Sequence, residues 1–250
     1  MSAVRQYWTL APTHRYSLTF ALPLLVAYEL LAAALSDDPR RQGLRNGADV
    51  LLKAGFVALA GPHGPTIFMG LVVLGALWLI ARDRRRSAPL EGRVFVLMLV
   101  ESTLLALALG VVVGTLTAQL LGFAGLGTAL AAQAGTVERL DLPTRLMLSL
   151  GAGLYEELAF RVLLVAALAR GAQLALGWSR RSAGVLATIL GALLFSAFHY
   201  VGPYGDRLEL ASFTYRAIAG LVFSALYLAR GFGITAWTHA LYDVWVMVVL

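Results

Sequence analysis

Cysteine is absent from this 250-residue sequence, and charged residues are scarce, at 14% of the chain. The absence of cysteine excludes disulfides, thiolate catalysis and cysteine-ligated zinc. A soluble domain carries about a quarter charged residues, so the low charge content argues against a soluble protein. Hydrophobic residues make up 59% of the chain and form several long apolar stretches in succession. The sequence therefore predicts an all-α, polytopic transmembrane helical bundle.

Basic residues outnumber acidic ones, and the formal net charge is +6. Nearly all of the basic residues are arginines in short loops between apolar stretches, most densely from Arg82 to Arg93. This distribution predicts cytoplasmic loops in contact with phospholipid head groups. Because the chain has no basic domain, we expect no nucleic-acid partner. Its arginine- and alanine-rich composition favours a prokaryotic inner membrane as the location.

The apolar stretches predict seven transmembrane helices, or eight if one ambiguous segment also crosses. The seven are residues 17–35, 66–81, 94–121, 144–169, 184–200, 210–228 and 234–250. The ambiguous segment is 46–60, which contains Asp49 and Lys53 and could instead lie at the membrane interface. No internal repeat is visible, so we expect one membrane domain.

Two polar features precede the C-terminal helices. Glu101, near the start of the helix expected at 94–121, is interpreted as an interfacial carboxylate whose side chain reaches towards water. Residues 122–143 are small and then mildly charged, and are expected to form a loop. The loop should end at a helix N-cap, either Asp141 or Thr144.

Three ionisable side chains interrupt the apolar run from Leu146 to Ala169, namely Glu156, Glu157 and Arg161. Charges at membrane depth are costly unless they are paired or face a polar cavity, so such a cluster indicates a functional site. On an α-helix, residues four apart share a face, which pairs Glu157 with Arg161 and leaves Glu156 pointing elsewhere. A carboxylate in an apolar cavity can act as a general base or acid. The alternative is that all three form one structural ion-pair network.

Two histidines lie in similarly apolar surroundings downstream. His199 shares a helix face with Phe195, and His239 shares one with Asp243, because each pair is four residues apart. Each histidine could be an ordinary core residue or half of a packing pair. Together with the acidic cluster, they predict one buried site between the C-terminal helices.

The three motifs, in order on successive spans, resemble the CPBP family of CAAX-type proteases and bacteriocin-processing, or Abi, intramembrane proteases. The motifs are Glu-Glu-x-x-x-Arg with phenylalanine before the arginine, Phe-x-x-x-His and His-x-x-x-Asp, and the resemblance covers about residues 145–248. It implies an intramembrane endopeptidase in which Glu157 and Arg161 support the site. The implied substrate is a membrane-associated peptide or protein, such as a lipidated tail, a leader peptide or a membrane-anchored protein.

The resemblance also implies roles for the remaining motif residues. Glu156 and His199 would activate a water that attacks the scissile amide, with Glu156 as general base, and His239 and residue 243 would polarise the carbonyl group. The CAAX-protease branch has asparagine where this chain has Asp243. An ionised aspartate cannot donate to an oxyanion, so Asp243 must stay protonated, orient His239 as an acceptor, or bind something else. This departure points towards the broader prokaryotic Abi-like branch.

Three other functions stay open at this stage. Glu156, His199 and His239 could ligate zinc around a catalytic water, but the chain lacks a His-Glu-x-x-His motif, so we favour metal-free chemistry without a cofactor. A proton-coupled transporter or a non-enzymatic scaffold could also place acidic residues and histidines within the membrane. For the protease, residues 1–143 are expected to supply N-terminal transmembrane helices and loops, and residues 144–250 the catalytic helical core.

Overall fold

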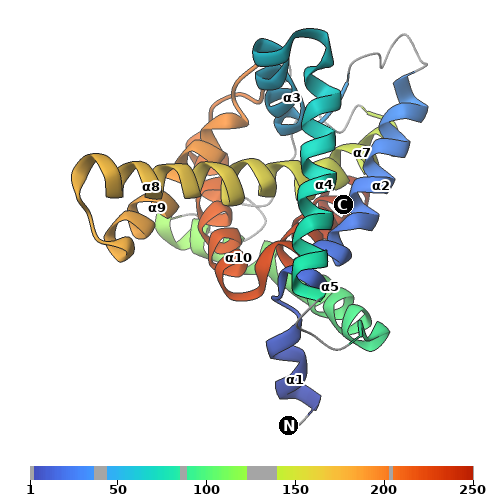
Figure 1. Cartoon of the computed structure of the whole chain (residues 1–250). Coiled ribbons are helices and arrows are strands. Elements are labelled where there is room, and N and C mark those ends of the chain that lie inside the picture. Colours follow the sequence, from blue (N-terminus) through green and yellow to red (C-terminus); the bar gives the residue numbers. More distant parts are fainter. Residues whose placement is uncertain (1–2, 37–43, 85–88, 123–139, 203–204, 250) are drawn as a thin grey trace.

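The computed structural model describes residues 3–36, 44–84, 89–122, 140–202 and 205–249. These residues form helices and short connections without a strand (Figure 1), which confirms the predicted all-α bundle. The helices are α1 (Ala3–Leu10), α2 (His14–Ser36), α3 (Gly47–Ala60), η1 (Gly61–His63), α4 (Gly64–Arg84), α5 (Gly92–Leu121), α7 (Leu142–Gly151), the π-helix η3 (Ala152–Leu164), α8 (Val165–Leu176), α9 (Arg180–Phe198), α10 (Leu210–Val244) and the π-helix η4 (Trp245–Val249).

Six helical units in the described part of the chain are long and apolar enough to cross a membrane. The sequence predicted seven or eight, and the difference arises partly in α10. There, the helices expected at 210–228 and 234–250 follow each other so directly that they count as one unit, but the predicted break between them is present, because Gly231 has a φ of 79° and a ψ of 176°, which are not helical. A left-handed φ is readily adopted only by glycine, so the chain bends sharply here without a loop.

The ambiguous segment 46–60 forms α3, which is joined to α4 by the short helix η1. Gly64 lies so close to the backbone of Phe56 and Val57 that a Cβ atom on it would collide with them. This close approach lets the chain fold back, so α3 packs against α4 (Figure 1). By length and composition, α3 and α4 count together as one candidate span rather than two.

Several expected connections lie partly outside the described residues. Residues 85–88 belong to the arginine-rich loop between Arg82 and Arg93, and residues 123–139 to the loop expected at 122–143. The end of the latter is described, and Asp141 is the N-cap residue of α7. Its side chain accepts a hydrogen bond from the Thr144 hydroxyl, so both predicted capping residues lie at this helix start.

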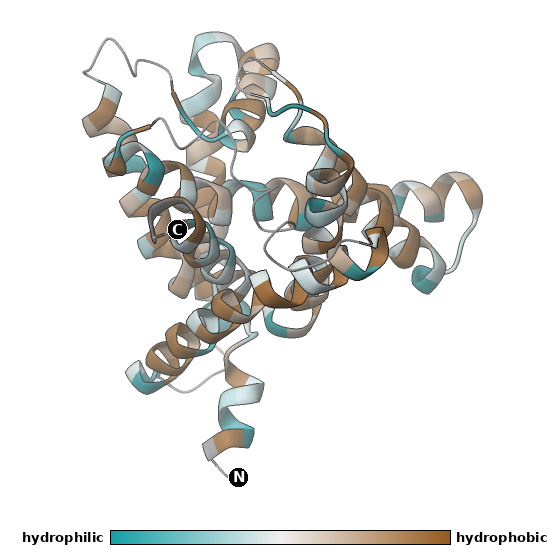
Figure 2. Ribbon diagram, turned by 180° about the vertical axis from the view of Figure 1, so that it is seen from behind, coloured by the Kyte–Doolittle hydropathy of each residue, from teal (hydrophilic) through white to brown (hydrophobic). Residues whose placement is uncertain are grey.

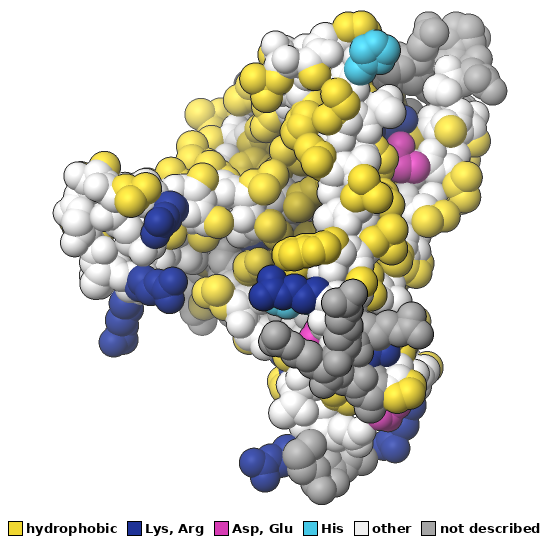
Figure 3. Space-filling model, in the orientation of Figure 1, with side chains coloured by type: hydrophobic (Ala, Val, Ile, Leu, Met, Phe, Trp, Pro, Cys, Tyr) yellow, Lys and Arg dark blue, Asp and Glu magenta, His cyan; other side chains and the backbone are white. Residues whose placement is uncertain are grey.

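The outer surface is largely apolar. Leucine, valine and isoleucine side chains on α4, α5, α8 and α9 are exposed, and hydrophobic residues predominate along most of the helices (Figure 2). In the space-filling view, hydrophobic side chains cover the middle of the molecule, and many of the visible basic side chains lie along its left and lower margins (Figure 3). An apolar surface of this kind is suited to lipid, since a soluble protein rarely exposes so large a patch.

Helix α10 is central to the bundle, since it packs against α2, α5, α7, α9 and η3. The main buried cluster lies between these helices and includes Tyr28, Tyr155, Phe160 and Phe195. On η3, a Cβ atom at Gly153 would overlap the carbonyl oxygen of Ala236 on α10. The missing side chain therefore allows the second half of α10 to lie directly against η3.

Glu101 does not reach towards water as the sequence analysis had suggested. Its two carboxylate oxygens each lie 2.7 Å from a nitrogen of Arg230, and it also accepts a hydrogen bond from Tyr7. Arg230 is buried immediately before the kink in α10. The carboxylate is therefore half of a bidentate ion pair that ties α1 and α5 to the bend in α10.

Candidate active site

The Glu-Glu motif lies on η3 and is buried, with Glu157 fully inaccessible. An ordinary α-helix was expected here, whereas the chain forms a π-helix, a rare conformation that is frequent at functional sites. The predicted pairing still holds, because Nη1 of Arg161 lies 3.2 Å from Oε1 of Glu157. This contact is an ion pair without hydrogen-bond geometry, and the guanidinium also lies over the ring of Phe195 at 4.1 Å. Arg161 is thus held by charge and by an aromatic face.

Glu156 faces a different set of partners from Glu157, as the sequence predicted. Its Oε1 atom accepts a hydrogen bond of 2.9 Å from Nδ2 of Asn46. Its Oε2 atom is buried without a hydrogen-bond partner among the described residues and lies 3.9 Å from Nε2 of His199. The two motif residues on consecutive spans, Glu156 and His199, are therefore neighbours.

His199 lies at the C-terminal end of α9, on the face shared with Phe195. Its Nδ1 atom is 2.9 Å from the carbonyl oxygen of Phe195. Because a carbonyl oxygen can only accept, Nδ1 carries the proton, and Nε2 of the neutral ring is an acceptor that faces Glu156. Further along the chain, the Asp206 N–H donates to the His199 carbonyl oxygen, and Asp206 pairs with the buried Arg216 at 2.5 Å. These contacts hold the end of α9 against α10.

His239 projects from the second half of α10 towards η3. Its Nδ1 atom lies 2.7 Å from Oε1 of Glu157, and its ring stacks on Phe223 with centroids 4.4 Å apart. Asp243 is one turn further along α10, and its Oδ2 atom lies 3.7 Å from Nε2 of His239. The predicted His239 and Asp243 pair therefore lies on one face, but the two side chains are too far apart to form a hydrogen bond.

The N-terminal half contributes residues that the sequence analysis did not assign to the site. Asn46 at the start of α3 contacts Glu156 directly, and Tyr155 donates to Glu29 at 2.6 Å. The available signal was the Asn-Gly-Ala-Asp pattern at 46–49, which is typical of a helix N-terminus but does not show which distant side chain it meets.

Glu156, His199 and His239 are the residues that would ligate zinc in the alternative mechanism. Within the described ranges, no three histidine, aspartate or glutamate side chains gather into a group that could hold a metal ion. Nδ1 of His239 is engaged by Glu157, and Oε1 of Glu156 by Asn46. These contacts leave Oε2 of Glu156 and Nε2 of both histidines without a hydrogen-bond partner in the described part of the chain, and a zinc ligand needs only one such atom, so metal-free chemistry stays a prediction.

A buried carboxylate facing a histidine, and a second carboxylate bound to another histidine, define an acid–histidine site inside a multi-pass membrane protein. Residues 138–245 match the model of the Rce1-like family, described as type II CAAX prenyl endopeptidase Rce1-like. This match confirms the predicted resemblance to CAAX-type proteases, over nearly the same residues. Comparisons with curated proteins and with solved structures found no match. The match over these residues and the apolar helices together support an intramembrane endopeptidase, which implies a membrane-associated protein or peptide as substrate.

Proposed function

We propose that this protein hydrolyses a peptide bond in a lipidated tail, a leader peptide or a membrane-anchored protein, using a water activated by Glu156 and His199. The observation that carries the proposal is the pair of free acceptors: Oε2 of Glu156 and Nε2 of His199 face each other at 3.9 Å. A water oxygen about 2.8 Å from both atoms could donate one hydrogen to each. Such a water would be oriented with a lone pair free for attack.

The proton transfers follow from this arrangement. Glu156 accepts a proton from the water as the oxygen attacks the carbonyl carbon, which gives a tetrahedral intermediate and a protonated Glu156. When the carbon–nitrogen bond breaks, Glu156 returns the proton to the leaving nitrogen. The products are a peptide with a new carboxylic acid group, which keeps the second hydrogen of the water, and a peptide with a new amine, and Glu156 is again ionised. His199 orients the water throughout this cycle.

His239 is proposed to stabilise the oxyanion of the intermediate. Glu157 holds Nδ1, so Nε2 is the ring nitrogen left to donate when the ring carries both protons. Glu157 is in turn paired with Arg161, which supplies a positive charge close to the site. In this scheme, Glu157 and Arg161 are positioning residues rather than catalytic ones. The composition favours a prokaryotic inner membrane as the location.

The test is cleavage of a library of membrane-associated peptides by the purified full-length protein in detergent. Wild type is compared with Glu156→Gln and with Glu91→Gln, a matched carboxyl-to-amide change at an exposed position. We expect activity to disappear only in the Glu156 variant and to persist with a strong chelator. Loss of activity with chelator would instead support a zinc enzyme.

Two further outcomes separate the other classes of function. If the wild-type protein cleaves no peptide across a broad library, the protease proposal is wrong. Ion flux in proteoliposomes that changes in Glu156→Gln would then support a transporter, and partner binding that persists in this variant would support a scaffold.

A further inference from the structure

Asn46 is a buried residue whose side-chain amide makes two hydrogen bonds and whose main-chain N–H makes a third. Its Oδ1 atom accepts from the N–H of Ala48 at 2.9 Å, which caps α3. Its own N–H is 3.3 Å from the hydroxyl oxygen of Tyr28, and its Nδ2 atom donates to Oε1 of Glu156 at 2.9 Å. Because the cap requires the oxygen on one side, the NH₂ group must face Glu156.

This contact distinguishes the two oxygens of Glu156. Oε1 is occupied by the amide of Asn46, whereas Oε2 has no hydrogen-bond partner in the described part of the chain and faces His199. A carboxylate that accepts a hydrogen bond at one oxygen cannot rotate freely. Oε2 is therefore the atom presented to a water beside His199.

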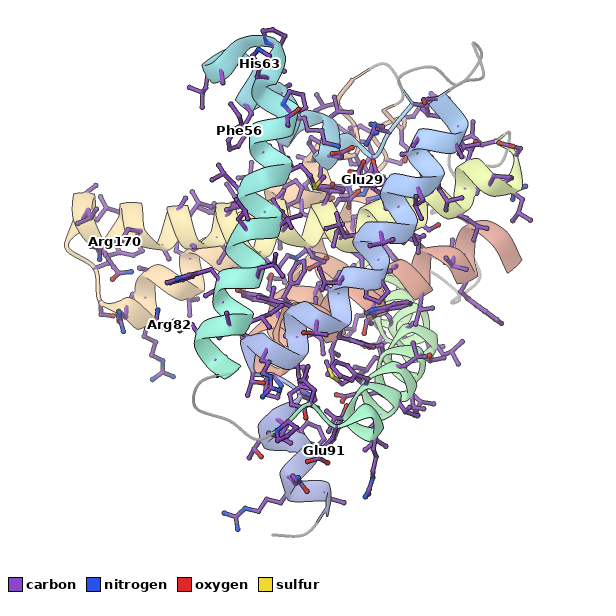
Figure 4. The ribbon with its side chains drawn as sticks, turned by 45° about the vertical axis from the view of Figure 1, so that its right-hand side comes forward. Glu29, Phe56, His63, Arg82, Glu91 and Arg170 are labelled. Atoms are coloured by element: carbon purple, nitrogen blue, oxygen red, sulfur yellow. The ribbon has the colours of Figure 1, made fainter. Side chains whose placement is uncertain are left out.

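A network of four charged side chains holds the start of α3 in place. Glu29 on α2 and Asp49 on α3 are bridged by both Arg45 and Lys53, with all four ion-pair distances between 2.7 and 3.1 Å. Tyr155, the neighbour of Glu156 on η3, donates to the same Glu29. Figure 4 labels Glu29 on α2 in this region. Adjacent residues of η3 are thus both tied to the start of α3, one through the charge network and one through Asn46.

Close packing also places Asn46 and Gly47 against α7, which leads directly into η3, and against the end of α9. A Cβ atom on Gly151, at the end of α7, would lie 2.7 Å from Cβ of Asn46. A Cβ atom on Gly47 would lie 3.1 Å from the ring of Phe198, the residue before His199. A Cβ atom would collide with its neighbour at Gly151 and be tightly packed at Gly47, so the start of α3 lies directly against α7 and the end of α9.

We propose that Asn46 is a positioning residue of the hydrolytic site, which fixes the orientation of Glu156 and stabilises its ionised form through the Nδ2 hydrogen bond. This inference rests on the proposed role of Glu156 as the general base. Other groups also act on Glu156: His199 at the end of α9, His239 on α10, and Arg161 on its own helix. Unlike these three residues, Asn46 hydrogen-bonds to the carboxylate of Glu156. It also comes from the part of the chain outside the family match.

The simpler alternative is that Asn46 only caps α3, and two variants separate these roles. Asn46→Ser keeps a capping oxygen but is too short to replace the donor to Glu156. Asn46→Asp keeps the shape and the cap but replaces the donor with an acceptor. The readout is the pH dependence of kcat/KM for peptide cleavage, because the acid limb reports protonation of the free enzyme's base.

The expected result is an acid limb that moves to higher pH by about one to two pH units in Asn46→Ser, since the ionised carboxylate loses a stabilising donor. The shift should be larger in Asn46→Asp, because a second carboxylate would face Glu156. The control is Asp49→Asn, which weakens the ion pairs of α3 without touching Glu156. It should lower the unfolding temperature and leave the acid limb in place.

A spectroscopic measurement keeps this inference separate from the proposed function. The infrared carboxyl band that disappears in Glu156→Gln can be titrated in the purified protein without any substrate. A midpoint that moves to higher pH in Asn46→Ser supports the positioning role even if no peptide is cleaved. The positioning role is wrong if the midpoint and the acid limb stay unchanged in both Asn46 variants while their stability falls as in Asp49→Asn. Asn46 would then serve only as the cap of α3.

Discussion

Nδ1 of His239 and Oε1 of Glu157 lie 2.7 Å apart, although 82 residues separate them in the chain. Glu157 is at the same time paired with the buried Arg161. One carboxylate therefore orients a histidine and neutralises an arginine. These two tasks make different predictions for stability and for activity.

Glu157→Gln should lower both the free energy of unfolding and the rate of peptide cleavage. The amide leaves Arg161 buried without its counterion, which costs about 3–5 kcal/mol of unfolding free energy. It also replaces a charged hydrogen bond to His239 with a neutral one, so kcat/KM should fall about tenfold. Thermal unfolding in detergent and peptide cleavage measure the two effects.

The double variant Glu157→Gln with Arg161→Met is the control. Removing both charges should restore most of the lost stability, since methionine still packs against Phe195, but it should not restore activity. If the double variant recovers both stability and turnover, Glu157 serves only as a counterion and the interpretation of His239 is wrong.

The contact between η3 and α10 at Gly153 predicts a second effect on the same histidine. Gly153→Ala should lower the unfolding free energy by about 1–3 kcal/mol, because a Cβ atom there overlaps Ala236 and lies 2.6 Å from Cβ of Ala240. Cleavage should fall as well, because Ala240 adjoins His239. The matched control is Gly171→Ala on α8, where no atom lies within 4 Å of the new Cβ. That change should be neutral or stabilise the helix by up to about 1 kcal/mol.

The ion pair between Glu101 and Arg230 lies immediately before the kink in α10, so we expect it to help hold the two halves of α10 in place. Arg230 also lies 3.9 Å over the ring of Trp8, and burial together with Glu101 raises the pKa of Tyr7, so its hydroxyl stays a donor. Glu101→Gln should cost about 2 kcal/mol of unfolding free energy, less than a fully buried pair because Glu101 is 18% exposed. Cleavage should also fall, since the kink sets the direction of His239.

For Glu101 the control is again the exposed Glu91→Gln, which should change the unfolding free energy by less than about 0.5 kcal/mol. Thermal unfolding of both variants, followed by cleavage assays, provides the comparison. Equal stabilities for the two would show that the ion pair does not hold the kink.

The sequence predicted the C-terminal motif residues well because their spacing is local. Glu157 with Arg161, Phe195 with His199, and His239 with Asp243 are pairs four residues apart, and a helical period places each pair on one face. The apolar runs likewise predicted the helices, since each long run must bury its backbone hydrogen bonds within itself.

Other features could not be predicted from local spacing. The contact from Asn46 to Glu156 spans 110 residues and leaves no periodic signal in either segment. The π-helix at Ala152–Leu164 has the same apolar pattern as an α-helix, so composition does not distinguish them.

Asp243 is the residue at which this chain departs from the CAAX-protease pattern, and its substitution tests the oxyanion role most directly. Its Oδ2 atom is 3.7 Å from Nε2 of His239, so no hydrogen bond orients the ring from this side. An ionised carboxylate beside a developing oxyanion opposes the reaction, whereas an amide would donate to it. Asp243→Asn should therefore raise kcat by about tenfold or more and change KM little. Asp243→Leu, which removes the repulsion but adds no donor, should show a smaller gain. A loss of activity in both variants would mean that Asp243 serves His239 as an acceptor or carries a proton itself, and that its carboxylate is needed.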